Sequence, residues 1–590
     1  MSNGVLALVA AIPMLVALIL MVGLRMGAMK AMPIAWLACA LGAFFVWKLP
    51  VDYITALTIQ GAISAVGVLI IVFGALVLLH TLQYSGGMET IQYGMQGVSR
   101  DMRVQAIIVG YMFGAFVEGA AGFGTPGALA APFMLALGFP PLAAAVLALI
   151  FNSFSVSFGA VGVTLLVGLQ TAIKTAIDGV IAAGAGGEFL TSLDFIVYVG
   201  KTTTLLHAPM IFILPVFTLG FITRMFGANR SWSEGFAAWK FCLFAAVAFF
   251  VPYMLMAWFF GPELPSLVGG LVGLGVIITG AKHGFCVPKG EAWTFGDPSK
   301  WEKNWTGSMA FDATKEYKPH MSQVMAWMPY ILIAIILMST RNDFLPFKKW
   351  LSTHGQLVFS GILGFDGSAP DKPMVKEALN LLYIPGILPF MVIALLTGIL
   401  HKMSIDKVAK AWLDTAVKMK AATISLIASV ALVAIFRGSG VNPAIAGEVA
   451  AGSATFLDSM PLALAKAVAS AVGPVWPMFA SLIGGLGAFI TGSHTVSNML
   501  FGAFQWDMAG QLGLPRADIL AGQSAGGAMG NMVCIHNIIA ACTVVGLVDR
   551  EGEILKKTVF PFLLYGLVVG IVVFTLIHLG WGNNTIFPGF

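Results

Sequence analysis

Residues 114–163 read GAFVEGAAGFGTPGALAAPFMLALGFPPLAAAVLALIFNSFSVSFGAVGV, and this stretch decides the fold. It is apolar, and Glu118 is its single formally charged residue. Two runs of small and polar residues, 118–127 and 152–159, interrupt it. Because Gly and Pro weaken or end helices, each interruption predicts a break between two half-length helices. The stretch therefore predicts broken helices rather than one continuous helix.

Part of this stretch returns near the other end of the chain. GAFVEG at 114–119 is echoed by GAFITG at 487–492, and LGFP at 137–140 is echoed by LGLP at 512–515, in the same order. Weak internal symmetry of this kind is typical of a duplicated membrane core. We expect two repeats on this basis. Inverted copies are favoured, although the sequence leaves parallel copies open.

The second copy carries its own interruptions. TGSHTVSN stands at 491–498, and a further polar and Gly-rich run extends over 524–537. With the two interruptions of the first copy, the chain has four predicted breaks. We place the cores of the two repeats at 104–170 and 475–547.

The composition indicates that lipid is the main solvent of the chain. It has 590 residues, of which 58% are hydrophobic and 10% charged, and its mean hydropathy is +0.90. Soluble domains carry about 25% charged residues. Apolar stretches long enough to cross a bilayer recur along the sequence, and we expect about 12 to 14 transmembrane helices. The predicted fold class is an all-α polytopic membrane protein.

The longer polar stretches divide the chain. We predict a first membrane half at 1–340, an aqueous connecting loop at 341–380 and a second membrane half at 381–590.

Basic residues gather at 25–30, 224–240 and 402–420. By the positive-inside rule these three stretches are predicted to be cytoplasmic loops, with the N-terminus outside.

Several classes of function are not supported by the sequence. The net charge of +5 is spread over short segments with no basic tract, so nucleic acid is not an expected partner. The five cysteines form no CxxC pair, which argues against disulfides and zinc. GQSAG at 522–526 matches a nucleophile motif but lies in a helical membrane segment rather than in a strand-turn-helix. We expect a protein that is not an enzyme, with no catalytic residues, no cofactor and no metal site.

The four breaks supply candidate substrate ligands. Unpaired backbone groups cost several kcal/mol in a bilayer unless protein or a water-filled cavity satisfies them. Amino ends of half-helices suit a carboxylate, and hydroxyl and amide side chains can bind a neighbouring hydroxyl group. The alternative is that Gly and Ser merely let helices pack closely. The candidates are Gly122, Gly124, Thr125, Asn152, Ser153, Ser155, Thr491, Ser493, Thr495, Ser497, Asn498, Asn531 and Asn537.

Glu118 is the leading candidate for proton coupling. It follows a run without formal charge, Val104–Val117. Removal from water disfavours a charged carboxylate, so a carboxyl at this depth can take up and release a proton. The alternative is a fixed role in capping the adjoining half-helix. His494 and His536 are the second choice, since imidazole titrates near neutrality, although either can simply hydrogen-bond within its loop.

Four other polar residues interrupt apolar runs. His80, His207 and His578 have no polar neighbours in the sequence, and we interpret them as structural. Arg437 ends an apolar run and is followed by Gly-Ser-Gly. It is either an anchor at the membrane interface or a residue that attracts anions.

The residues of the breaks resemble a known family. Residues 114–163, GPELP at 261–265, TGSHTVSN at 491–498 and the stretch from Gly546 to Val548 resemble the sequence of the lactate permease family. The resemblance covers nearly the whole chain in order. It implies the architecture of the ion-transporter superfamily, with a re-entrant hairpin and a broken helix in each repeat.

The resemblance also implies a function. It predicts secondary active transport of L-lactate or a related 2-hydroxy monocarboxylate, such as glycolate or D-lactate, by proton symport. The partners would be this small carboxylate, protons and the lipid bilayer, and the location a multi-pass protein of the bacterial inner membrane. A sodium-coupled carrier and a passive anion channel are the alternatives, and a homo-oligomer is left open.

This chain departs from its relatives at positions expected to contact substrate. Some members have Asp where this chain has His494, and Lys where it has Asn531. A Ser-Pro-Gln-Ser run in those members corresponds to residues 534–537 here. The departures predict a shift in the preferred acid or coupling ion with the transport class retained.

Overall fold

The computed structural model describes residues 3–24, 26–122, 124–183, 191–306, 317–341, 345–384, 386–547 and 550–580. In these ranges twelve helices are long and apolar enough to cross a membrane. The predicted all-α polytopic fold is thereby confirmed. Arg25, Phe123 and Val548, which belong to motifs discussed above, lie outside the described residues.

The first repeat core is a chain of short helices joined by breaks. Its elements are α5 (Met102–Gln105), a π-helical segment (Ala106–Phe113), α6 (Gly114–Ala121), α7 (Thr125–Ala136), α8 (Pro141–Phe151), a 3-10 turn (Phe154–Phe158), α9 (Gly159–Val163), a second π-helical segment (Thr164–Leu169) and α10 (Gln170–Ala182). Gly122 and Gly124 have positive φ angles of 63° and 74°, so the chain turns sharply between α6 and α7. A residue with a Cβ rarely adopts this conformation. The predicted breaks at 118–127 and 152–159 are confirmed.

The predicted second repeat core has an element order that resembles the part of the first from α6 to α9. It consists of α21 (Pro477–Thr491), α22 (His494–Leu512), α23 (Arg516–Met529), a 3-10 turn (Gly530–Met532) and α24 (Ile535–Val544). Gly492, with φ of 75°, separates α21 from α22, as Gly122 and Gly124 separate α6 from α7. The tight turn before Pro515 corresponds to the one before Pro140. The internal repeat, its inverted relation and the domain boundaries remain predictions.

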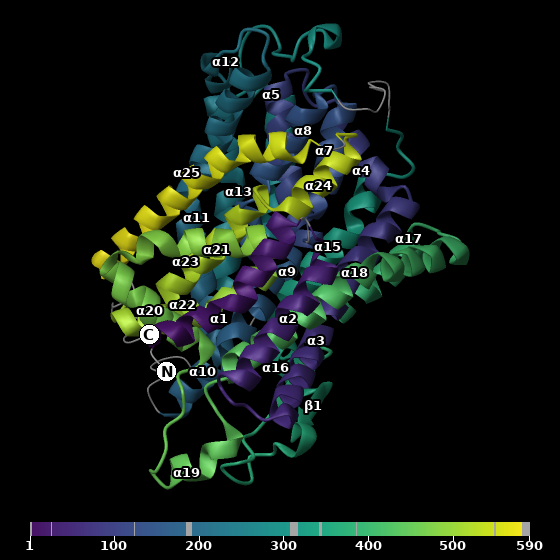
Figure 1. The fold of residues 1–590 in the computed structure, drawn as a ribbon. Helices are drawn as coiled ribbons and strands as arrows, with labels where there is room; N and C mark the ends of the chain where they lie inside the picture. The colour runs from purple at the N-terminus through teal and green to yellow at the C-terminus, as the bar shows by residue number, and fades with distance from the viewer. Residues whose placement is uncertain are drawn as a thin grey trace.

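The other helices surround the two cores. They are α1 (Asn3–Leu18), α2 (Ala28–Phe45), α3 (Val51–Tyr84), α4 (Gly87–Gln96), α11 (Ser192–Phe226), α12 (Trp232–Phe236), α13 (Trp239–Phe259), α14 (Pro265–Lys282), α15 (Gln323–Arg341), α16 (Phe347–Thr353), α17 (Ile393–Leu400), α18 (Ile405–Gly438), α19 (Ala446–Ala450), α20 (Met460–Val472) and α25 (Glu551–His578). The long helix α18 packs along α3 and α2 (Figure 1).

The basic stretch at 402–420 is not a loop, which corrects that prediction. Residues 405–420 form the first half of α18, and only its second half is apolar enough to be part of a membrane span, Ala422–Ala450. The stretch is helical although it is rich in charge, because a helix can carry a charged end that extends beyond its apolar span.

The predicted connecting loop contains a small antiparallel hairpin. Strand β1 (Gln356–Ser360) pairs with β2 (Lys376–Asn380), and Gln356 lies opposite Asn380. The whole of β1 is exposed, and in Figure 1 it lies at the end of the molecule opposite α12. Arg341, the first residue of the predicted loop, is instead buried. Its Nε donates to Oε1 of Glu263 at 2.7 Å, which ties the end of α15 to the loop before α14.

Candidate functional site

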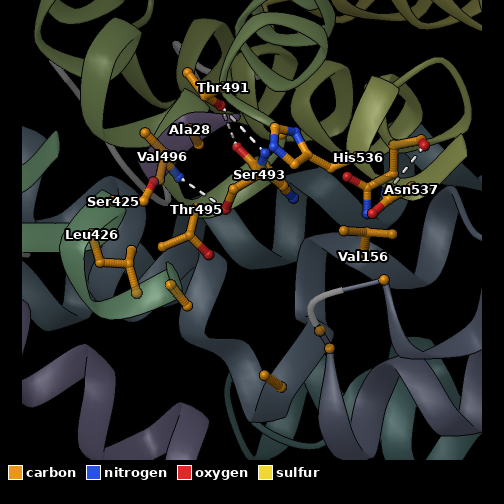
Figure 2. Close-up of a pocket in the computed structure, with 18 of the residues that line it drawn as sticks. Ala28, Val156, Ser425, Leu426, Thr491, Ser493, Thr495, Val496, His536 and Asn537 are labelled. Carbon is orange, nitrogen blue, oxygen red and sulfur yellow. Dashed lines mark hydrogen bonds between the residues drawn. The ribbon is translucent and has the colours of Figure 1, made fainter. Parts of the chain in front are cut away.

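All four breaks contribute to the wall of one cavity. It has a volume of about 570 Å³, which lies in the usual range for small-molecule sites. The predicted site residues that line it are Glu118, Gly122, Gly124, Thr491, Ser493, His494, Thr495, Asn531, His536 and Asn537. Breaks that are hundreds of residues apart in the sequence therefore share one site. Figure 2 shows Thr491, Ser493 and His536 in the upper part of the view, with Val156 next to Asn537.

Three helices that begin at the breaks have residues of their amino ends in the wall of this cavity. Gly124 precedes α7, His494 and Thr495 are the first residues of α22, and His536 and Asn537 lie in the first turn of α24. The first N–H groups of a helix have no carbonyl partner within the helix. They also carry the positive end of the helix dipole. The convergence of three such ends makes the cavity suited to an anion.

The side chains of the third break fix the start of α22. The Ser493 hydroxyl accepts from the backbone N–H of Val496 at 3.4 Å, the usual N-cap interaction. The Thr491 hydroxyl accepts from the N–H of Ser493 at 3.3 Å and lies 2.9 Å from the carbonyl oxygen of Ser493. Figure 2 shows these bonds at the cavity wall. The break is therefore an ordered structure with its hydroxyl groups held in place.

Glu118 contributes a buried carboxyl to the wall. Its side chain is 1% exposed and hydrogen-bonds to the side chain of Asn152. A Cβ at Gly159 would lie 2.5 Å from Oε1 of Glu118, so the glycine makes room for the carboxyl. Among the described residues, Oε2 has no hydrogen-bond partner. One oxygen is thus left for a proton, a water molecule or a ligand.

The protonation of His494 follows from its neighbours. The Asn498 amide nitrogen lies 3.0 Å from Nε2 of His494 and 3.0 Å from the carbonyl oxygen of Thr164. Since the amide nitrogen only donates, Nε2 of His494 accepts, and the ring proton is assigned to Nδ1. His494 is therefore neutral in this arrangement.

The fourth break packs against the first and third. A Cβ at Gly492 would lie 2.3 Å from Nδ1 of His536, and one at Gly124 would lie 2.4 Å from Oδ1 of Asn537. The Asn537 amide also donates to the carbonyl oxygen of Asn531 at 3.3 Å. These close approaches require glycine at both breaks.

Six predicted ligands are buried but do not line the cavity. They are Thr125, Asn152, Ser153, Ser155, Ser497 and Asn498. Several hold the broken backbone, because the hydroxyl of Thr125 donates to the carbonyl of Gly122 and that of Ser497 donates to Gly484 at 2.7 Å. These residues lie behind the cavity wall and support its backbone.

Helix α18 contributes residues to the cavity wall that were not predicted from the sequence. Lys418, Ala422, Ser425 and Leu426 line the cavity from this helix, and Ala28 lines it from the start of α2. Figure 2 shows Ser425 and Leu426 on the side of Thr495 and Val496. The spacing of 418, 422 and 425 places these residues on one helix face, and this was the signal that could have identified them.

Two histidines interpreted as structural have polar partners from distant helices. His80 Nδ1 lies 2.7 Å from the Thr415 hydroxyl, and His207 bridges the hydroxyls of Ser157 at 2.8 Å and Tyr565 at 2.6 Å. His578 lies near the exposed end of α25 and contacts the carbonyl oxygen of Phe574.

Arg437 connects two helices and does not line the cavity. Its guanidinium donates to the Thr175 hydroxyl at 2.6 Å and to the carbonyl oxygen of Thr171. The residue therefore ties the end of α18 to α10.

Comparison with known proteins identifies relatives over nearly the full length. The family model described as L-lactate permease matches residues 6–580. A putative L-lactate permease of Haemophilus influenzae is 30% identical over 537 residues, covering 89% of this chain and 90% of the relative. The glycolate permease GlcA and the L-lactate permease of Escherichia coli K12 are each 27% identical, covering 96% of this chain and 95% of the relative.

Proposed function

The chain belongs to the L-lactate permease family, and on that premise we propose that it carries L-lactate or a related 2-hydroxy monocarboxylate, such as glycolate or D-lactate, by proton symport across the bacterial inner membrane. A carboxylate substrate is supported by one observation above all, the convergence of three helix amino ends on the cavity. Their N–H groups and dipoles favour a carboxylate. The hydroxyl groups of Thr491, Ser493 and Thr495 provide partners for the 2-hydroxyl group.

The proton-coupling step is assigned to Glu118. A carboxylate buried in a bilayer is costly, so its charged form is disfavoured unless a partner compensates it. Glu118 lines the cavity, and one of its oxygens is without a partner among the described residues. A proton on this carboxyl and an anionic substrate beside it would cross the membrane together with no net charge. His494 and His536, at the same wall, are the alternative proton carriers.

Accumulation against a gradient tests this proposal. Purified protein in liposomes should concentrate labelled lactate when a proton gradient is imposed inward, because inward proton flow would drive the anion with it. The same vesicles with a sodium gradient at fixed pH should show no accumulation. Accumulation under the sodium gradient alone would favour a sodium-coupled carrier. Equilibration without accumulation under either gradient would indicate a passive channel and overturn symport.

A further inference from the structure

Lys418 is the only lysine or arginine that lines the cavity among the described residues. It lies on the face of α18 that also carries Ala422 and Ser425. It stands four residues before the apolar span that begins at Ala422, so it lies at the edge of the predicted hydrocarbon region. The only carboxyl group in the wall, within the same described part of the chain, is Glu118. The charged nitrogen of Lys418 is thus one of the strongest electrostatic features of the cavity.

Two buried residues hold the Lys418 side chain. Its Nζ lies 2.9 Å from Nε2 of His80, and Nδ1 of His80 lies 2.7 Å from the hydroxyl of Thr415. The Thr415 hydroxyl donates its proton to the carbonyl oxygen of Ala411 at 2.7 Å, so it accepts from His80. The proton of His80 is therefore on Nδ1, and Nε2 accepts from Lys418. His80 and Thr415 are 4% and 0% exposed, so this support is shielded from water.

The positive charge of Lys418 has no carboxylate partner in the described part of the chain. Asp414, one helical turn earlier, is the usual ion-pair partner for a lysine at this spacing. Its Oδ2 instead accepts a hydrogen bond from the hydroxyl of Tyr84. Lys174 and Lys466, in contrast, pair with Asp178 and Asp458. Within the part of the chain that the structure describes, Lys418 is hydrogen-bonded only to a neutral imidazole, which leaves two of its three N–H donors for another partner.

We propose that Lys418, positioned by His80 and Thr415, binds the carboxylate of the transported acid in this cavity. This inference rests on the proposed function and adds to it a specific binding residue. An ammonium group forms charge-assisted hydrogen bonds with a carboxylate, which are about twice as strong as neutral ones. The neutral acceptor at His80 fixes the direction of the ammonium group without neutralising it. The converging helix ends and Lys418 would together attract the anion from two sides.

A different role for a lysine at this depth is anchoring to lipid phosphate groups. Long basic side chains near helix ends extend to the headgroups and need no ligand in the cavity. The two roles differ in one measurable property. A lysine that binds substrate distinguishes a carboxylate from the neutral amide of the same acid, whereas a lipid anchor does not.

The experiment compares lactate with lactamide in liposomes that contain the full chain. Initial uptake of labelled lactate is measured for the wild type, Lys418→Met and the control Lys420→Met, and unlabelled lactamide is added as a neutral competitor. Lys420 lies on the same helix and is exposed, as Lys418 is, but it does not line the cavity. We expect Lys418→Met to raise the KM for lactate about ten-fold, because a charge-assisted bond is lost, with inhibition by lactamide unchanged. Lys420→Met should behave as the wild type.

The outcomes separate the two hypotheses. An unchanged KM in Lys418→Met, with normal uptake by the wild type, would overturn the assignment of Lys418 and leave the lipid anchor. A wild type without saturable uptake of lactate or glycolate would overturn the proposed function itself. His80 provides a second variant if Lys418→Met folds poorly. His80→Gln, which retains an acceptor, should keep the preference for lactate over lactamide, and His80→Leu should lose it. Equal preference in both variants would contradict the positioning role.

Discussion

The side chain of Asn537 lies directly against Gly124, such that a Cβ at Gly124 would stand 2.4 Å from the Asn537 Oδ1. The contact joins the first break of the chain to the fourth, which are more than 400 residues apart in the sequence. Gly124 also has a φ of 74°, which residues with side chains rarely adopt. Steric and backbone requirements therefore coincide at the point where the first and fourth breaks meet.

The first prediction concerns this glycine. Gly124→Ala should reduce lactate uptake by more than about ten-fold, because a strained backbone and a displaced Asn537 each cost on the order of 1–3 kcal/mol. Gly127→Ala is the matched control, since Gly127 lies in the first turn of α7, which Gly124 precedes, and its Cβ would meet no atom closer than 3.9 Å. Uptake per correctly folded protein, with folding checked by size-exclusion chromatography, measures the effect. Equal uptake by both variants would argue against a tight joint between the breaks.

The second prediction concerns Glu118. Glu118→Gln should abolish uptake driven by a proton gradient and leave exchange of labelled for unlabelled lactate partly intact, because an amide keeps the shape of the side chain but cannot carry the proton. Glu448→Gln, at an exposed position in α19, should change neither activity. If proton-driven uptake persists in Glu118→Gln, the carboxyl has only a capping role.

The third prediction separates His494 from Glu118. Protonation of His494 would place a donor on Nε2, where the Asn498 amide already donates at 3.0 Å. We therefore expect His494→Gln to alter the KM for lactate and to retain the dependence of uptake on the proton gradient. The measurement is uptake with and without an imposed proton gradient at saturating lactate. Loss of the gradient dependence in this variant would make His494 the proton carrier.

The fourth prediction concerns stability. Arg341 and Glu263 form an ion pair of 2.7 Å with side chains only 3% and 4% exposed. Removal of one partner leaves an unpaired buried charge, so Arg341→Met should destabilise the protein by about 3–5 kcal/mol. Lys174→Met breaks an exposed pair and should cost about 0–1 kcal/mol. Thermal unfolding in detergent compares the two, and similar shifts in Tm would contradict the assigned importance of the buried pair.

Much of the fold and part of the site could be predicted from local composition. Gly, Pro and Ser clusters mark the places where a helix stops, and the breaks identify Glu118, His494, His536 and Asn537 as residues of the cavity wall. Lys418 could not be found in this way. Its neighbours 402–420 are rich in charge, which is also typical of a loop. The spacing of 418, 422 and 425 indicates a helix face, but which cavity this face lines depends on the packing of α18 against the distant helix α3.

The hydrogen-bond partners of the buried histidines could not be predicted either, because they also come from distant helices. His80 is bonded to Lys418 across 338 positions of the sequence, and His207 to Tyr565 across 358. A hydrophobic pattern shows that such residues are buried, but it contains no information on which polar group of another helix will face them. Partners of this kind depend on the arrangement of the helices in three dimensions.

The most direct test of the central claim, that this cavity carries a 2-hydroxy monocarboxylate, is competition for labelled L-lactate uptake in liposomes of purified protein. We expect saturable uptake that glycolate and D-lactate inhibit strongly. Acetate, which lacks the 2-hydroxyl group, and dicarboxylates, which add a second charge, should inhibit weakly. The absence of saturable uptake, or inhibition by acetate and dicarboxylates as strong as that by lactate itself, would contradict it.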